Sequence, residues 1–112
     1  MANKSTFYTL KRRLDGYFFQ KEEGELIFIK NQKFGVYRSY ITVEGMKRKR
    51  WFVVELECGQ SFGSGDTKAA AIMNARNNLE NIHPVLFSNK ISESIKRFGR
   101  SPLYQQGFDL SE

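Results

Sequence analysis

The sequence contains a single cysteine, Cys58, and a single histidine, His83, among its 112 residues. One cysteine cannot close a disulfide within the chain, and a Cys/His zinc site would lack its ligands, so a reducing compartment is the simplest expectation. No apolar run approaches the ~20 residues that cross a bilayer, and residues 1–6 lack the apolar segment of a secretory signal. The sequence predicts a protein that is not secreted and does not contact a membrane: cytoplasmic, or nuclear if eukaryotic.

Residues suited to catalysis are also scarce. His83 precedes a proline and has no second histidine or obvious nucleophile to act with, which argues against a catalytic triad and a metal site. Glu55 and Glu57 have the strand spacing of carboxylates that hold Mg²⁺ in nucleases, but Cys58 and Gly59 follow where such enzymes have a lysine. We therefore predict a protein that is not an enzyme, with no catalytic residue, no metal and no cofactor.

Positive charge is abundant and unevenly distributed. Lysine and arginine number 18 against 12 acidic residues, which gives a net charge of +6 and a pI near 9.6. Residues 101–112 hold Asp109 and Glu112 but no basic residue, so residues 1–100 carry 18 basic against 10 acidic side chains, a net charge of +8. A pI above about 9 is the electrostatic footprint of a protein that binds a polyanion. Nucleic acid is therefore the expected partner.

The N-terminal half predicts one helix followed by strands. Apolar residues at positions 7, 10, 14, 17 and 18 would form one face of a helix over residues 5–20. Runs rich in β-branched and aromatic residues predict strands over residues 26–29, 36–43 and 51–58, and a short strand ends at residues 63–65. The expected sheet is antiparallel with three to four strands. Four consecutive cations lie between two of these strands: Lys47, Arg48, Lys49 and Arg50.

The C-terminal half predicts two helices and a tail. Asp66 or Thr67 can cap a helix that continues to about residue 82, and small residues early in its apolar stripe would allow close packing on the sheet. Ser88 can cap a short helix over residues 91–98 that ends at Gly99. The predicted fold is thus α+β and forms one domain over residues 1–100. Residues 101–112 are expected to form a flexible tail.

The segment from residue 36 to residue 82 resembles the double-stranded RNA-binding domain. The matching features are a Gly-containing loop, an aromatic on the following strand, a Gly-x-Gly turn that opens a helix, and regular small residues within that helix; they fall on Glu44-Gly45, Phe52, Gly63 to Lys68, Ala71, Ala75 and Leu79. Ala69 and Ile72 stand where the family has two further lysines. The resemblance implies that Lys68 and the helix N-terminus hold phosphates of a duplex, since helix N-termini favour anions. It implies two other contact regions, at Lys11, Arg12 and Arg13 and at Lys47, Arg48, Lys49 and Arg50.

Two alternatives remain open from the sequence. Gly35-Val36, Trp51 and Asp66-Thr67 are similar to AP2-type and integrase arm-binding domains, which place a three-stranded sheet in a DNA major groove. The apolar segment Val85, Leu86 and Phe87 instead indicates a protein-binding adaptor or inhibitor, encoded by a phage or mobile element, or a homodimer contact. Exposed aromatics among Tyr37, Tyr40 and Trp51 could stack on bases, although core packing is the commoner role of such residues.

Overall fold

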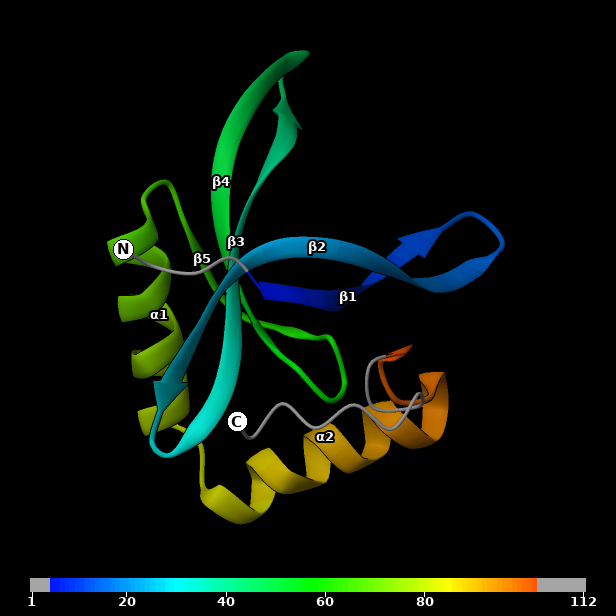
Figure 1. The fold of residues 1–112 in the computed structure, drawn as a ribbon, viewed down its shortest axis with the longest axis vertical. Coiled ribbons are helices and arrows are strands. Elements are labelled where there is room, and N and C mark those ends of the chain that lie inside the picture. Colours follow the sequence, from blue (N-terminus) through cyan, green and yellow to red (C-terminus); the bar gives the residue numbers. More distant parts are fainter. Residues whose placement is uncertain (1–4, 103–112) are drawn as a thin grey trace.

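The computed structural model describes residues 5–102, which form an α+β fold (Figure 1). Five antiparallel strands lie in the order β1-β2-β3-β4-β5, and two helices follow them in the chain. The elements are β1 (Ser5–Arg13), β2 (Gly16–Ile29), β3 (Gln32–Val43), β4 (Met46–Glu55), β5 (Ser61–Gly65), α1 (Lys68–Glu80) and α2 (Pro84–Phe98). The α+β class is confirmed, and the sheet has one strand more than the upper limit of the prediction.

The predicted N-terminal helix is wrong. Residues 5–13 form β1, and residues from 16 onward form β2, paired from Ser5↔Gly24 to Arg13↔Gly16. Both segments are rich in aromatic residues, and β1 also contains threonines. These residue types are favoured in strands because they fit a pleated, half-buried surface. Asp15-Gly16 is also a hairpin turn signal. The apolar spacing fitted a helix, but alternate residues of β1, Phe7 and Thr9, are the ones that are buried.

Strand β2 bends so that it can pair with β1 and β3 in succession. Residues 16–24 pair with β1, and residues 25–29 pair with β3. Gly24 stands at the changeover, where a Cβ would lie 1.9 Å from the carbonyl oxygen of Val36, so no other residue fits without moving the backbone. The bend carries the β1–β2 hairpin across one face of β3 and β4 (Figure 1). Phe7 is completely buried there and meets Tyr37 edge-on, with ring centroids 6.0 Å apart.

Helix α1 covers the opposite face of the sheet. Its buried residues are the small and apolar ones expected from the sequence: Ala71, Ala75 and Leu79. They pack with Phe34, Val36 and Val53 in the larger of two hydrophobic clusters. Thr67 caps the helix, as predicted, because its side chain accepts a hydrogen bond from the N–H of Ala70. The predicted strands over residues 26–29 and 36–43 and the short strand that ends at residue 65 are all present, whereas the strand predicted over residues 51–58 ends at Glu55 and is followed by a turn.

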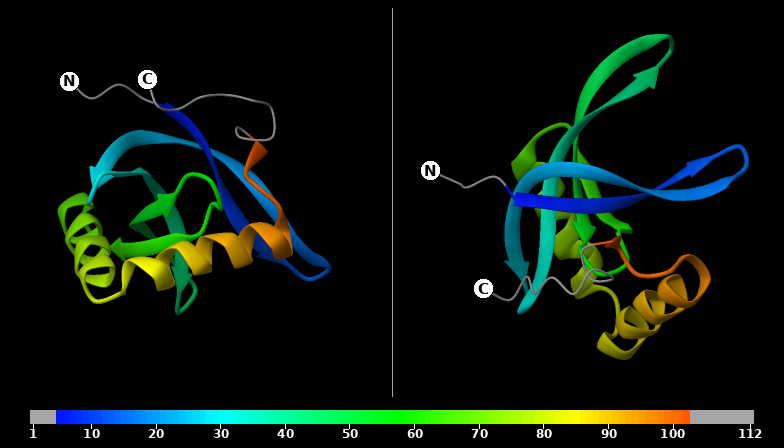
Figure 2. Two further views of the ribbon diagram at one scale, coloured as in Figure 1. Left: turned by 90° about the horizontal axis from the view of Figure 1, so that it is seen from below. Right: turned by 45° about the vertical axis from the view of Figure 1, so that its right-hand side comes forward.

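Helix α2 is longer than the short helix predicted from the sequence. It begins at Pro84 rather than Ile91, and its cap is His83, whose Nδ1 accepts from the N–H of Val85 at 3.1 Å. Proline is well tolerated as the first helical residue, so Pro84 can begin α2 directly after the cap. Gly99 ends α2 as predicted. Figure 2 shows α2 lying across the end of the molecule nearest the β2–β3 turn.

The predicted flexible tail falls mostly outside the described residues. Only residues 101 and 102 of the predicted tail are described. Ser101 is completely buried, and its N–H donates to the carbonyl of Glu57 at 2.9 Å. Within residues 5–102, no helix has the length and apolar character needed to cross a membrane.

Candidate nucleic-acid interface

Two long β-hairpins project from the sheet in different directions (Figures 1 and 2). We call residues 10–19 the first ribbon, which ends at the β1–β2 turn. We call residues 38–51 the second ribbon, which ends at the β3–β4 turn. The second ribbon contains the four consecutive cations predicted from the sequence, and the first contains the three cations that were expected on a helix.

Strand alternation divides the cations of the second ribbon between its two faces. Arg48 is paired with Ile41 and Arg50 with Ser39, which places both arginines on the face that carries Tyr37 and Phe52. Lys47 and Lys49 lie on the opposite face, paired with Thr42 and Tyr40 respectively. All of residues 47–49 are exposed.

The same alternation divides the cations of the first ribbon. Lys11 and Arg13 share a face with buried Phe7 and Thr9, while Arg12 lies on the other face. The Lys11 ammonium donates to the Tyr37 hydroxyl at 3.1 Å and lies 5.4 Å from the centre of that ring. The inner face of the first ribbon therefore contacts the Tyr37 face of the second ribbon at its base.

The inner faces of the two ribbons meet at their base, where Lys11 contacts Tyr37, and we call these two faces together the fork. It is defined by Lys11, Arg13, Phe18, Ser39, Ile41, Arg48 and Arg50. The Arg13 guanidinium lies over the Phe18 ring, with its central carbon 4.0 Å from the ring centre. Of the eight binding residues predicted from the sequence, four lie in the fork. Arg12, Lys47 and Lys49 lie on the outer faces, and Lys68 lies on α1.

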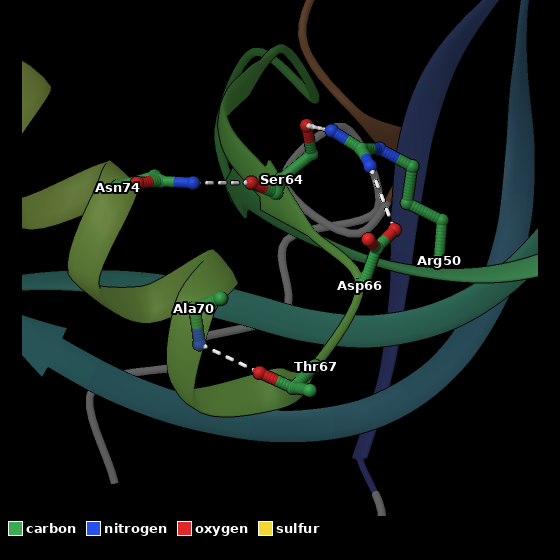
Figure 3. Close-up of polar contacts among 6 residues, drawn as sticks. All are labelled: Arg50, Ser64, Asp66, Thr67, Ala70 and Asn74. Atoms are coloured by element: carbon green, nitrogen blue, oxygen red, sulfur yellow. Dashed lines mark hydrogen bonds and ion pairs between the residues drawn. The ribbon is translucent and has the colours of Figure 1, made fainter.

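Arg50 is anchored at the base of the second ribbon (Figure 3). Its guanidinium donates to Asp66 at 3.1 Å and to the hydroxyl of Ser64 at 3.0 Å. Because Asp66 offsets its charge, Arg50 contributes less to the potential of the fork than Arg48, which is exposed near the tip. The anchor also ties β4 to the loop before α1.

The glycines of the Gly-x-Gly turn allow α1 to pack closely against β5. A Cβ on Gly63 would lie 2.6 Å from the backbone nitrogen of Ala75, so the glycine is required by the approach of α1 to β5. At the start of the helix, the Lys68 ammonium forms an ion pair with the carboxylate of Glu25. The one lysine that matches the family motif therefore already has an anionic partner within the fold.

The asparagines of α1 were not among the residues predicted from the sequence to be functional. Asn74 and Asn78 donate to the carbonyl oxygens of Ser64 and Phe62, at 2.8 Å and 2.7 Å, and so cover the outer edge of β5 (Figure 3 shows Asn74). Beside them is an open cleft of about 1020 Å³ between α1, β5 and α2. The available signal was three asparagines within one 13-residue helix, an unusual number because asparagine favours caps and turns over helix interiors.

The aromatic and apolar residues singled out from the sequence differ in how deeply they are buried. Tyr37 is 3% exposed and packs in the core, which excludes it from base stacking. Tyr40 is exposed on the outer face of the second ribbon, and Trp51 is half-buried at its base. In α2, Phe87 belongs to the core, whereas Val85 and Leu86 are exposed. The apolar segment at the start of α2 is thus only partly explained by packing.

The two carboxylates with nuclease-like spacing have structural partners. The Glu55 carboxylate accepts the N–H of Cys58 at 2.8 Å, and Glu57 pairs with Arg100 at 2.9 Å. Burial raises the pKa of the Cys58 thiol to about 12, so this buried cysteine is unreactive. Within residues 5–102, no group of three or more His, Cys, Asp and Glu side chains could hold a metal ion.

Glu55 gives a testable pH dependence. Burial raises its pKa above the ordinary value of 4.5, although the hydrogen bond from the Cys58 N–H opposes the shift. The folded state therefore holds this proton more tightly than the unfolded state, and its ionisation removes stability as pH rises from 4.5 through the raised pKa. We expect Glu55→Gln, which keeps the acceptor but cannot ionise, to be at least as stable as the wild type at pH 7. Urea unfolding at pH 4 and pH 7 measures this, and a large loss of stability at pH 7 would contradict it.

A search of family models, of curated proteins and of solved structures finds no match to this chain.

Proposed function

We propose that this chain is a non-catalytic nucleic-acid-binding protein that holds a duplex in the fork between its two ribbons. The observation that carries the proposal is that Lys11, Arg13, Arg48 and Arg50 lie on the inner faces of two hairpins, which are far apart in sequence and meet at their base. Arginines spaced along an extended ribbon suit phosphates spaced along a strand, because the guanidinium can pair with a phosphate through two parallel hydrogen bonds.

The shape of the ribbons favours duplex DNA over duplex RNA. The major groove of B-DNA, about 12 Å wide, admits a two-stranded β-ribbon. The major groove of A-form RNA is deep and too narrow for side chains to read. The resemblance to the double-stranded RNA-binding domain implied an N-terminal helix, which is replaced here by β1 and β2. It also implied a phosphate clamp at Lys68, which is paired with Glu25.

The mode of binding differs from that of a three-stranded sheet in a groove. In an AP2-type arrangement the sheet face opposite the helix meets DNA. Here Phe7 covers that face over Tyr37 and Val54, and only the second ribbon extends beyond it. Contact through projecting ribbons therefore fits the fold better than contact through the sheet itself.

The proposal is tested by fluorescence anisotropy of labelled duplex DNA, duplex RNA and single strands from about 50 to 200 mM salt. Binding dominated by phosphate contacts should weaken along a straight line in log Kd against log salt, with a slope of about 0.9 for each phosphate that is neutralised. Because Asp66 offsets the charge of Arg50, we expect the other three fork cations to give a slope of about three on duplex DNA, with weaker binding to duplex RNA and single strands. Absence of binding to all of them at 50 mM salt would overturn the proposal.

A protein-binding adaptor is the second candidate, favoured by the side chains of Val85 and Leu86, which are 58% and 55% exposed on the first turn of α2. An apolar pair of this kind could dock on another protein or on a second copy of this chain. Sedimentation velocity over a range of concentrations distinguishes self-association from a monomer. A dimer that dissociates on substitution of both residues by serine, in a protein that binds no nucleic acid, would favour this candidate.

A further inference from the structure

Each ribbon ends in an exposed apolar side chain beside cations. Leu14 in the β1–β2 turn is fully exposed, at 110% of its reference area, and Arg12 and Arg13 directly precede it. Met46, immediately after the β3–β4 turn, is 69% exposed, and Lys47 and Arg48 directly follow it. A single exposed apolar residue is ordinary on a protein surface. Here both ribbons end in the same combination, an exposed apolar residue next to two cations.

The second tip presents its apolar residue in a fixed direction. The turn has two residues, Glu44 and Gly45, both with positive φ, at 52° and 78°. This is the type I′ pattern, whose twist matches that of the flanking strands. The turn holds Met46 in register opposite Val43, on the fork face of the ribbon that also carries Arg48. The Met46 side chain therefore lies on the same side of the second ribbon as the cations of the fork.

We propose that Leu14 and Met46 insert between base steps of a DNA duplex held in the fork and bend it. The inference rests on the proposed function and deepens it. Proteins that bend DNA commonly place leucine, methionine or a similar apolar side chain between base pairs, while cations beside the wedge hold the phosphates. A DNA duplex combines apolar stacked bases with an anionic backbone. Each ribbon tip matches this combination, because its apolar side chain lies within one or two residues of two cations. Unstacking is offset by the phosphate contacts that the bent duplex can reach on both arms.

The test is a bending measurement on a duplex of about 30 base pairs, well below the persistence length of about 150 base pairs. Energy transfer between dyes at its two ends reports the bend, and 2-aminopurine within the duplex reports unstacking. The tip variant is Leu14→Ala with Met46→Ala. The matched control is Val85→Ala with Leu86→Ala, which truncates two exposed apolar side chains on α2 instead.

We expect the wild type and the control to raise both energy transfer and 2-aminopurine fluorescence at saturation. The tip variant should bind with the same salt slope, because its cations are intact, but should lose both signals. Binding of the wild type without bending would overturn the wedge and leave the proposed function standing. A wild type that ignores DNA but binds anionic phosphatidylserine vesicles, with loss of that binding in the tip variant, would overturn both and assign the tips to a membrane surface.

Discussion

Replacing Arg13 and Arg48 together with alanine is expected to weaken binding to duplex DNA about 100-fold at low salt. A hydrogen bond to a charged group contributes about 1.5 kcal/mol or more, so removing one arginine–phosphate pair raises Kd roughly tenfold. The two arginines come from different ribbons, and each lies on the inner face of its ribbon. Their removal should also lower the slope of log Kd against log salt by about two, because each phosphate that is neutralised contributes about one.

The matched control for this variant is Lys47→Ala with Lys49→Ala. Both double variants remove two positive charges and lower the net charge equally from +6. Lys47 and Lys49 flank Arg48 in β4 but point to the outer face of the second ribbon. We expect a much smaller loss of affinity from the lysine pair. Equal losses from both pairs would show that total charge, and not the fork, determines binding.

Replacing Gly63 with alanine is expected to destabilise the fold by about 1–3 kcal/mol, the usual cost of inserting a methyl group into a closely packed site. The new Cβ would meet the backbone nitrogen and Cα of Ala75, at 2.6 Å and 2.7 Å, which cannot rotate away as a side-chain end could. Helix α1 must therefore shift from β5. Such a change is a large fraction of the 5–15 kcal/mol that typically stabilises a domain.

Urea unfolding followed by circular dichroism measures this cost. Met73→Ala is the control, because Met73 is 61% exposed on α1 and surface substitutions usually change stability by less than about 0.5 kcal/mol. The affinity of folded Gly63→Ala for duplex DNA should match that of the wild type. An unchanged stability combined with a loss of affinity would instead indicate that the glycine serves close approach of a phosphate, as the RNA-binding motif implied.

The elements predicted correctly are those whose signals are local. Helix α1 has a threonine cap and a stripe of small residues, and β3 and β4 have runs of β-branched and aromatic residues. The N-terminal segment was predicted wrongly because its apolar spacing fitted a helix, while its strand conformation depends on distant partners. Phe7 packs against Tyr37 and Val54, about 30 and 50 residues along the chain, and no local pattern reports those contacts.

The candidate site could be predicted as a set of residues but not as a surface. The cationic run was evident from the sequence, but its expected place in a hairpin loop is wrong. Residues 47–50 belong to β4, because the turn takes only residues 44 and 45, and the run extends from near the tip of the second ribbon to Arg50 at its base. The helix prediction placed Lys11, Arg12 and Arg13 mainly outside the apolar stripe of a helix. The strand instead directs Arg12 away from its neighbours and brings Lys11 to the hydroxyl of Tyr37. The fork can be recognised only when both segments are known to be strands, with alternating side chains and the correct pairing.

Chemical-shift mapping by NMR tests the central claim most directly. Titration of ¹⁵N-labelled protein with a short DNA duplex should perturb the amides of both ribbons and the Nε–H signals of Arg13 and Arg48 most strongly. The amides around Lys68 and along α2 should shift little. Perturbations confined to α2, to the cleft beside it or to the start of α1, with both ribbons unchanged, would contradict binding in the fork.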